Sequence, residues 1–114
     1  MFALGACTSQ GFSETEVEVA EFWVTPEHDV LQAGTVELVV ENYGEFSHTL
    51  VVSDASGAVI AATDLISPDT ETILRIDVKP GTYSFSCRIV MGLEDGTVAD
   101  HYQLGMVAHL KVVG

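Results

Sequence analysis

Four side chains spaced along the chain supply nitrogen or sulfur donors suited to a metal ion: His48, Cys87, His101 and Met106. Thiolate and thioether sulfur favour Cu(I), whereas imidazole nitrogen also suits Cu(II). Two imidazoles, one thiolate and a weak thioether therefore make a donor set that tolerates both oxidation states of copper. Each residue also has an ordinary interpretation, because buried histidine, cysteine and methionine often only fill core space.

The first two donors lie in phase with apolar residues of predicted strands. His48 shares its alternation with Leu50 and Val52, and Cys87 shares its alternation with Phe85. Successive side chains of a strand point to opposite faces, so residues two apart lie on one face. Both donors are therefore predicted to point into a core from strand ends, where the protein can shield a metal ion from water.

The same two-residue alternation continues through most of the chain, and no segment has a convincing helical period. Turn residues separate the expected strands, which are residues 14–24, 35–41, 47–53, 58–62, 72–78, 82–87 and 106–113. Short strands bounded by turns predict an all-β protein, a Greek-key sandwich or barrel of about seven to eight strands. We expect one domain over residues 14–114, preceded by a tail over residues 1–13.

Three segments resemble those that carry the ligands in plastocyanin-like and azurin-like blue copper proteins, the cupredoxins. They read Asn42-x-Gly44-x3-His48-Thr49, Pro80-Gly81-Thr82-Tyr83-x-Phe85-x-Cys87 and His101-x4-Met106. The resemblance covers nearly all of residues 14–114. It implies the cupredoxin fold and one copper ion (Cu⁺/Cu²⁺) on His48, Cys87, His101 and Met106. It further implies that Thr49 donates hydrogen bonds near the thiolate, and Asn42 is assigned a similar supporting role.

One segment departs from the resembled pattern. Thirteen residues, 88–100, separate Cys87 from His101, where plastocyanin-like proteins have only a few. We expect this insertion to form a loop beside the copper ion, and its Met91 is an alternative axial ligand. The remaining histidines, His28 and His109, are expected to lie outside the site.

Acidic residues far outnumber basic ones in this chain. Seventeen Asp and Glu face four Lys and Arg, which gives a formal net charge of −13. Nucleic acid is therefore excluded as a partner, because phosphate binding requires a basic face. The acidity favours a redox partner with a basic docking face, and general solubility or a salty environment explains it equally well. No stretch reaches the roughly 20 apolar residues of a transmembrane span.

The N-terminal residues Leu4-Gly5-Ala6-Cys7 resemble the lipobox of bacterial lipoproteins. In that family the cysteine carries lipid, so the resemblance implies a lipid anchor on Cys7 and an extracytoplasmic location, periplasmic or at the cell surface. The basic and apolar regions of a signal peptide are largely missing here, and an ordinary flexible terminus is the alternative.

The leading hypothesis is a mononuclear type 1 (blue) copper protein that carries single electrons between redox proteins. A copper chaperone or storage protein without electron transfer is the alternative, and a metal-free interaction module on the same fold is a third. An enzyme is not expected, because a copper oxidase or reductase needs a second copper centre. His28 and His109 are too few to build one.

Overall fold

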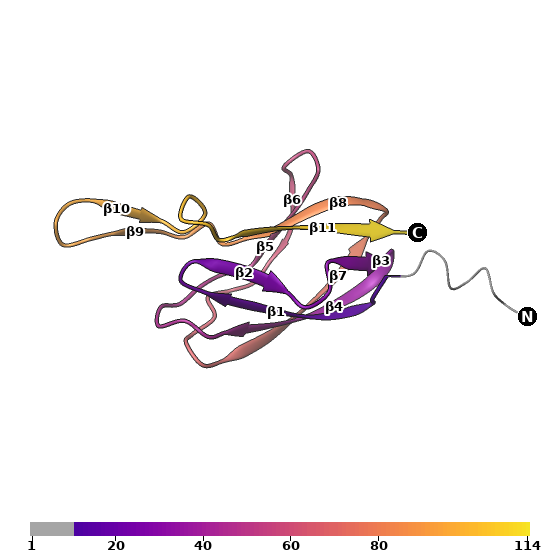
Figure 1. Ribbon diagram of the computed structural model, residues 1–114, viewed down its shortest axis with the longest axis horizontal. Helices are drawn as coiled ribbons and strands as arrows, with labels where there is room; N and C mark the ends of the chain where they lie inside the picture. The colour runs from indigo at the N-terminus through magenta and orange to yellow at the C-terminus, as the bar shows by residue number, and fades with distance from the viewer. Residues whose placement is uncertain (1–10) are drawn as a thin grey trace, which may run out of the picture.

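The computed structural model describes residues 11–114, whose strands form two packed layers (Figure 1). One sheet has the order β2-β1-β4-β7, with β1 at Glu14–Ala20, β2 at Trp23–Pro26, β4 at Gly34–Asn42 and β7 at Glu71–Val78. The other has the order β3-β11-β8-β5-β6, with β3 at Val30–Gln32, β5 at Val51–Asp54, β6 at Val59–Ala62, β8 at Gly81–Ser86 and β11 at Val107–Val113. A separate pair consists of β9 (Val90–Gly92) and β10 (Val98–Asp100).

This architecture confirms the predicted all-β sandwich, although its strands are shorter and more numerous than expected. The predicted strand over residues 14–24 is wrong in one respect: a turn at Glu21 and Phe22 divides it into β1 and β2, which pair antiparallel. The short β3 strand was not expected at all, and it pairs in parallel with β11. Between residues 11 and 114 there is no helix, and hence none of the length and hydrophobicity that a membrane span requires.

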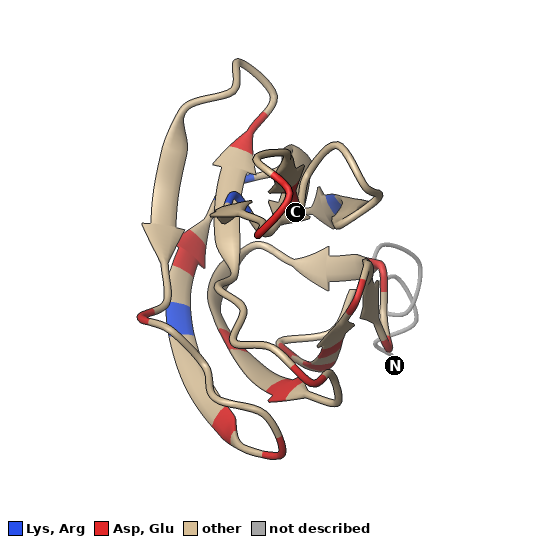
Figure 2. Ribbon diagram, turned by 90° about the vertical axis from the view of Figure 1, so that its left-hand side faces the viewer, with Lys and Arg blue, Asp and Glu red and all other residues tan. Residues whose placement is uncertain are grey.

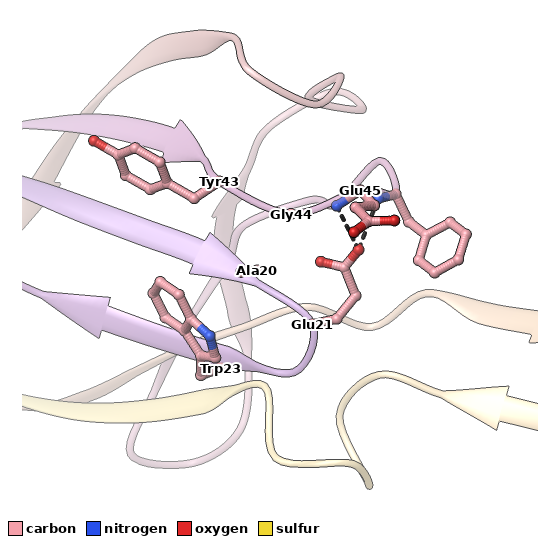
Figure 3. A pocket seen from close by; sticks show the side chains of 7 residues that line it. Ala20, Glu21, Trp23, Tyr43, Gly44 and Glu45 are labelled. Atoms are coloured by element: carbon pink, nitrogen blue, oxygen red, sulfur yellow. Dashed lines mark hydrogen bonds between the residues drawn. The ribbon is translucent and has the colours of Figure 1, made fainter.

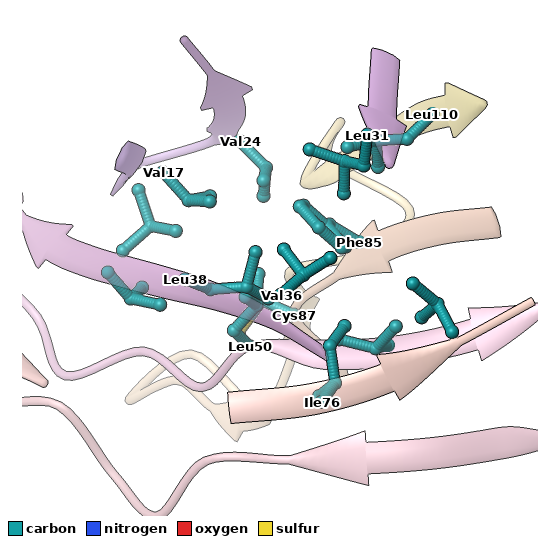
Figure 4. Close-up of a cluster of buried hydrophobic side chains, with 14 of the residues drawn as sticks. Val17, Val24, Leu31, Val36, Leu38, Leu50, Ile76, Phe85, Cys87 and Leu110 are labelled. Atoms are coloured by element: carbon teal, nitrogen blue, oxygen red, sulfur yellow. The ribbon is translucent and has the colours of Figure 1, made fainter. Parts of the chain in front are cut away.

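The hydrophobic core lies between the two sheets and follows the predicted alternation. In β1 the acidic residues point outward while Val17 and Val19 are buried. Leu50 and Val52 are also buried, as expected, although β5 itself begins only at Val51. Figure 4 shows Cys87 among these apolar side chains, so the core extends as far as the predicted thiolate ligand.

The insertion over residues 88–100 is a β-hairpin, which corrects the expected loop. Val90 pairs with Asp100 and Gly92 pairs with Val98, so β9 and β10 bond only to each other. Asp95 closes the turn by accepting hydrogen bonds from the backbone nitrogen and hydroxyl of Thr97, at 2.9 and 2.6 Å. The β-branched residues on both arms favour strands over an open loop. The hairpin extends away from the two sheets (Figure 1).

Hydrogen bonding to the sheets begins before β1. The backbone nitrogen of Phe12 donates to the Val30 carbonyl, and that of Gln32 donates to the Phe12 carbonyl, both at 3.0 Å. The lipobox-like segment and Cys7 lie outside the described residues.

Candidate metal centre

The strand ends bring the predicted donors together at one end of the sandwich. His48 precedes β5 and forms an isolated bridge with Ile66. Cys87 directly follows β8, and its backbone nitrogen donates to the Met106 carbonyl at 3.1 Å. His101 directly follows β10, and Met106 directly precedes β11. We call the following side chains the buried donor set, because each is fully buried: His48, Cys87, His101 and Met106.

Three atoms of the buried donor set converge on one point. His48 Nδ1 lies 3.2 Å from His101 Nδ1, and Cys87 Sγ lies 3.9 Å from the first nitrogen and 3.5 Å from the second. Donors at about 2.0 Å (nitrogen) and 2.3 Å (sulfur) from a shared centre, 120° apart, are separated by roughly 3.5–3.7 Å. The observed separations bracket these values, so the three donors fit a trigonal metal ion.

The outer nitrogen of each imidazole has an acceptor of its own. His48 Nε2 lies 3.2 Å from Glu21 Oε2, and His101 Nε2 lies 3.2 Å from Met91 Sδ. A proton on each Nε2 satisfies these acceptors and leaves both Nδ1 lone pairs facing Cys87 Sγ. The two Nδ1 lone pairs then face one another at 3.2 Å, and a bound cation relieves their repulsion.

The supporting residues named from the sequence lie near the donors in different ways. Thr49 Oγ1 lies 3.7 Å from Cys87 Sγ. Asn42 bonds to the neighbouring loops instead of to a donor atom: its side-chain nitrogen donates to the carbonyls of Phe46 and Ile66, both at 2.9 Å. Asn42 therefore organises the loop that leads to His48.

The other candidate ligands lie apart from this convergence. Met91 contacts the outer edge of His101, whereas the donor atoms meet at the inner edge of that ring. His109 is exposed on β11, and His28 stacks on Phe12 with ring centroids 3.5 Å apart. Among residues 11–114, the cluster of histidine, cysteine and carboxylate donors close enough for one metal ion consists of His48, Cys87 and His101.

Burial and hydrogen bonding shift the pKa values of two ionisable groups at the site, His101 and Glu21. Burial lowers the pKa of His101, and the neighbouring His48 lowers it further, so this imidazole is held neutral as a ligand must be. Burial by itself raises the pKa of Glu21, but the hydrogen bond from His48 opposes it. Together with three backbone hydrogen bonds, that contact brings the Glu21 pKa below its ordinary value.

The turn between β1 and β2 is the part of the site that sequence reasoning missed. Its Glu21 contacts His48, and the Phe22 ring packs edge-on against His101 with centroids 5.1 Å apart. One signal was available: Glu21 continues the alternation of Val17 and Val19, which places an acidic residue on the inward face of a strand. A carboxylate on that face requires a polar partner.

A family model described as "Cupredoxin-like domain" matches residues 2–99 of the chain. The match includes His48 and Cys87 and stops before His101 and Met106. A comparison with curated proteins found no match.

Several solved structures have a similar fold. A reduced auracyanin from the photosynthetic bacterium Roseiflexus castenholzii has a TM-score of 0.67 and 18% identity, over 91% of this chain and 99% of that chain. Auracyanin A, described as a "blue" copper protein from Chloroflexus aurantiacus, has a TM-score of 0.62 and 16% identity, over 87% and 98%. Rusticyanin from Thiobacillus ferrooxidans has a TM-score of 0.57 and 16% identity, over 89% and 78%. At these identities the similarity describes the backbone fold.

Proposed function

This chain belongs to the cupredoxin-like domain family, and from that premise we propose that it binds one copper ion in the buried donor set and carries single electrons between redox proteins. The observation that carries the proposal is the convergence of His48 Nδ1, His101 Nδ1 and Cys87 Sγ within 3.9 Å of one another. Two imidazoles with one thiolate and a weak axial thioether are the ligands of blue-copper electron-transfer sites. The solved auracyanin A with this fold is described as a "blue" copper protein.

The protein's own residues supply what such a site requires. His48 and His101 each direct an Nδ1 nitrogen toward Cys87, and Cys87 supplies the thiolate once its proton is lost on binding. Met106 is fully buried beside Cys87, to which its backbone carbonyl is hydrogen bonded. When bound, copper supplies the one-electron couple between Cu(II) and Cu(I). Because packed strands hold the donors in place, little rearrangement accompanies the change of charge, which favours rapid transfer.

The direct test is a visible spectrum recorded after Cu(II) is added to the reduced, metal-free protein. We expect an intense thiolate-to-copper absorption with one copper ion bound per chain, and reversible bleaching on reduction. Cys87→Ser removes the sulfur donor, so the absorption disappears. Circular dichroism of the variant checks that the sandwich remains folded.

Two results would contradict the electron carrier. The proposal would be wrong if the protein took up no copper or if the copper-loaded protein showed no thiolate-to-copper absorption. Copper that binds without reversible cycling and transfers rapidly to a chelated acceptor would favour the chaperone or storage alternative. A fully buried donor set opposes rapid release, because the ligands must open before the ion can leave.

Two further features of the proposal concern the surroundings of the protein. We place it outside the cytoplasm, with Cys7 as its lipid attachment, because Leu4-Gly5-Ala6-Cys7 resembles a lipobox. Mass spectrometry of the membrane fraction tests the modification directly. Its partners are proposed to be redox proteins with a basic docking face, on account of the net charge of −13.

A further inference from the structure

The turn between β1 and β2 holds a carboxylate against the outer nitrogen of His48. Glu21 Oε2 lies 3.2 Å from His48 Nε2, and the side chains of the two residues are 18% and 0% exposed. The contact is therefore largely withdrawn from water, where a hydrogen bond to a charged group is strongest. It touches the ring on the side opposite the nitrogen that faces Cys87.

The other oxygen of the same carboxylate is held by the loop that precedes His48. Glu21 Oε1 accepts hydrogen bonds from the backbone nitrogens of Glu45 at 2.6 Å and Phe46 at 2.8 Å (Figure 3). Three donors thus converge on two carboxylate oxygens. A neutral amide at this position has one oxygen and one N–H₂ group, so it cannot accept from all three donors.

The loop is also shaped to leave room for this carboxylate. A Cβ atom on Gly44 would overlap Glu21 Oε2, so this position requires glycine as long as the carboxylate is in place. The Gly44 backbone nitrogen donates to Asn42 Oδ1 at 2.8 Å, which fixes the bend of the loop. Glu21 therefore explains the glycine at position 44, and Asn42 is explained by its hydrogen bonds to Gly44, Phe46 and Ile66.

We propose that Glu21 is a positioning residue for the copper site: by accepting the Nε2 proton of His48 it fixes the ring tautomer, strengthens Nδ1 as a donor and lowers the reduction potential. A carboxylate behind a ligating imidazole raises the basicity of the ligand. Its negative charge also favours the more highly charged Cu(II) ion. Both effects favour Cu(II) over Cu(I) and therefore lower the reduction potential. One electron enters from a reduced redox protein, and no bond to Glu21 forms or breaks.

The inference rests on the proposed function, and Glu21→Gln tests it by potentiometric titration of the copper-loaded protein. Loss of this support weakens Cu(II) binding about tenfold or more relative to Cu(I). A tenfold change corresponds to a rise of about 59 mV for a one-electron couple. Glu45→Gln is the matched control, because it removes the same charge from an exposed neighbouring side chain and keeps the backbone N–H that Glu21 uses.

Equal shifts in Glu21→Gln and Glu45→Gln would overturn the proposal, since the carboxylate would then act only as one surface charge among many. An unchanged potential in a folded Glu21→Gln protein would overturn it as well. Should that variant fail to fold, Gly44→Ala displaces the carboxylate without removing its charge, and the potential must still rise.

A second readout needs no copper. In the metal-free protein, nitrogen NMR of His48 should show the proton on Nε2, and Glu21→Gln should shift the population toward the other tautomer. A wild-type ring protonated on Nδ1 would contradict the role of Glu21. A wild-type protein that takes up no copper yet shows the Nε2 tautomer would instead contradict the proposed function and leave the contact intact.

Discussion

Two polar side chains contact the proposed copper ligands, and we expect them to have opposite effects on the reduction potential. Glu21 accepts a hydrogen bond from His48, and Thr49 Oγ1 lies 3.7 Å from Cys87 Sγ. A hydrogen bond donated by Thr49 withdraws charge from the thiolate and so favours Cu(I). We expect Thr49→Val to lower the reduction potential, opposite in sign to Glu21→Gln, and to shift the thiolate-to-copper absorption. Potentiometry with spectral detection measures both changes.

Thr82→Val is the matched control for this substitution. Thr82 lies in β8, the strand that leads to Cys87, and its side chain is exposed. The same exchange of a hydroxyl for a methyl group there should leave the potential unchanged. A rise in potential in Thr49→Val would mean that the hydroxyl accepts from its surroundings and donates nothing to the sulfur.

At the scale of elements, the β9–β10 hairpin covers the edge of the second imidazole. His101 is fully buried, and Met91 of β9 lies against its Nε2. Met91→Ala should open this edge to solvent and speed oxidation of the Cu(I) protein by a small inorganic oxidant several-fold. Stopped-flow bleaching and recovery of the thiolate absorption gives the rate.

The hairpin offers its own control in Val98→Ala. Val98 lies on β10 with 62% of its surface exposed, and it pairs with Gly92 across the hairpin. Its truncation removes apolar surface without uncovering His101, so the oxidation rate should stay at the wild-type value. Equal acceleration in both variants would show that general loosening of the hairpin controls access, and no change in either would remove Met91 as a cover.

At the scale of the whole molecule, acidic positions far outnumber basic ones and are spread over strands and connecting loops (Figure 2). The parallel register of β1 and β4 sets Glu14 beside Glu37 and Glu18 beside Glu41, and Arg75 neutralises Glu37 at 3.0 Å. The neighbouring Glu41 raises the pKa of Glu16, first through a side-chain hydrogen bond and then through the repulsion between the two negative charges. The molecule therefore attracts cations over a wide area.

The negative net charge predicts that the rates of oxidation by a cationic and by an anionic inorganic oxidant depend on salt in opposite ways. The rate with a cationic oxidant should fall as salt is added, and the rate with an anionic oxidant should rise. Screening is strong once the Debye length reaches about 10 Å at 0.1 M. Stopped-flow rates over a range of ionic strength measure both slopes. Slopes near zero for both oxidants would mean that the electron leaves through a surface that the net charge does not influence.

The strand pattern predicted most of the fold, and it predicted the inward direction of two proposed ligands, His48 and Cys87, both of which are buried. Alternation placed Leu50, Val52 and His48 on one buried face, and a strand determines this face locally because its side-chain period is two. The sequence predicts a loop over residues 88–100, whereas the structure has a hairpin there. Its paired arms are short, and such a hairpin depends on cross-strand pairing that no single segment reveals.

The sequence by itself determined the kinds of donor, their order along the chain and their inward direction, because residue type and strand period are local properties. Only the tertiary structure decided which side chains contact the outer nitrogen of each histidine. Glu21 reaches His48 across 27 residues and Met91 reaches His101 across a hairpin, and these contacts exist only once separate turns have packed against one another. The number of residues between two side chains does not predict such a contact, because a chain segment of one length can adopt many folds.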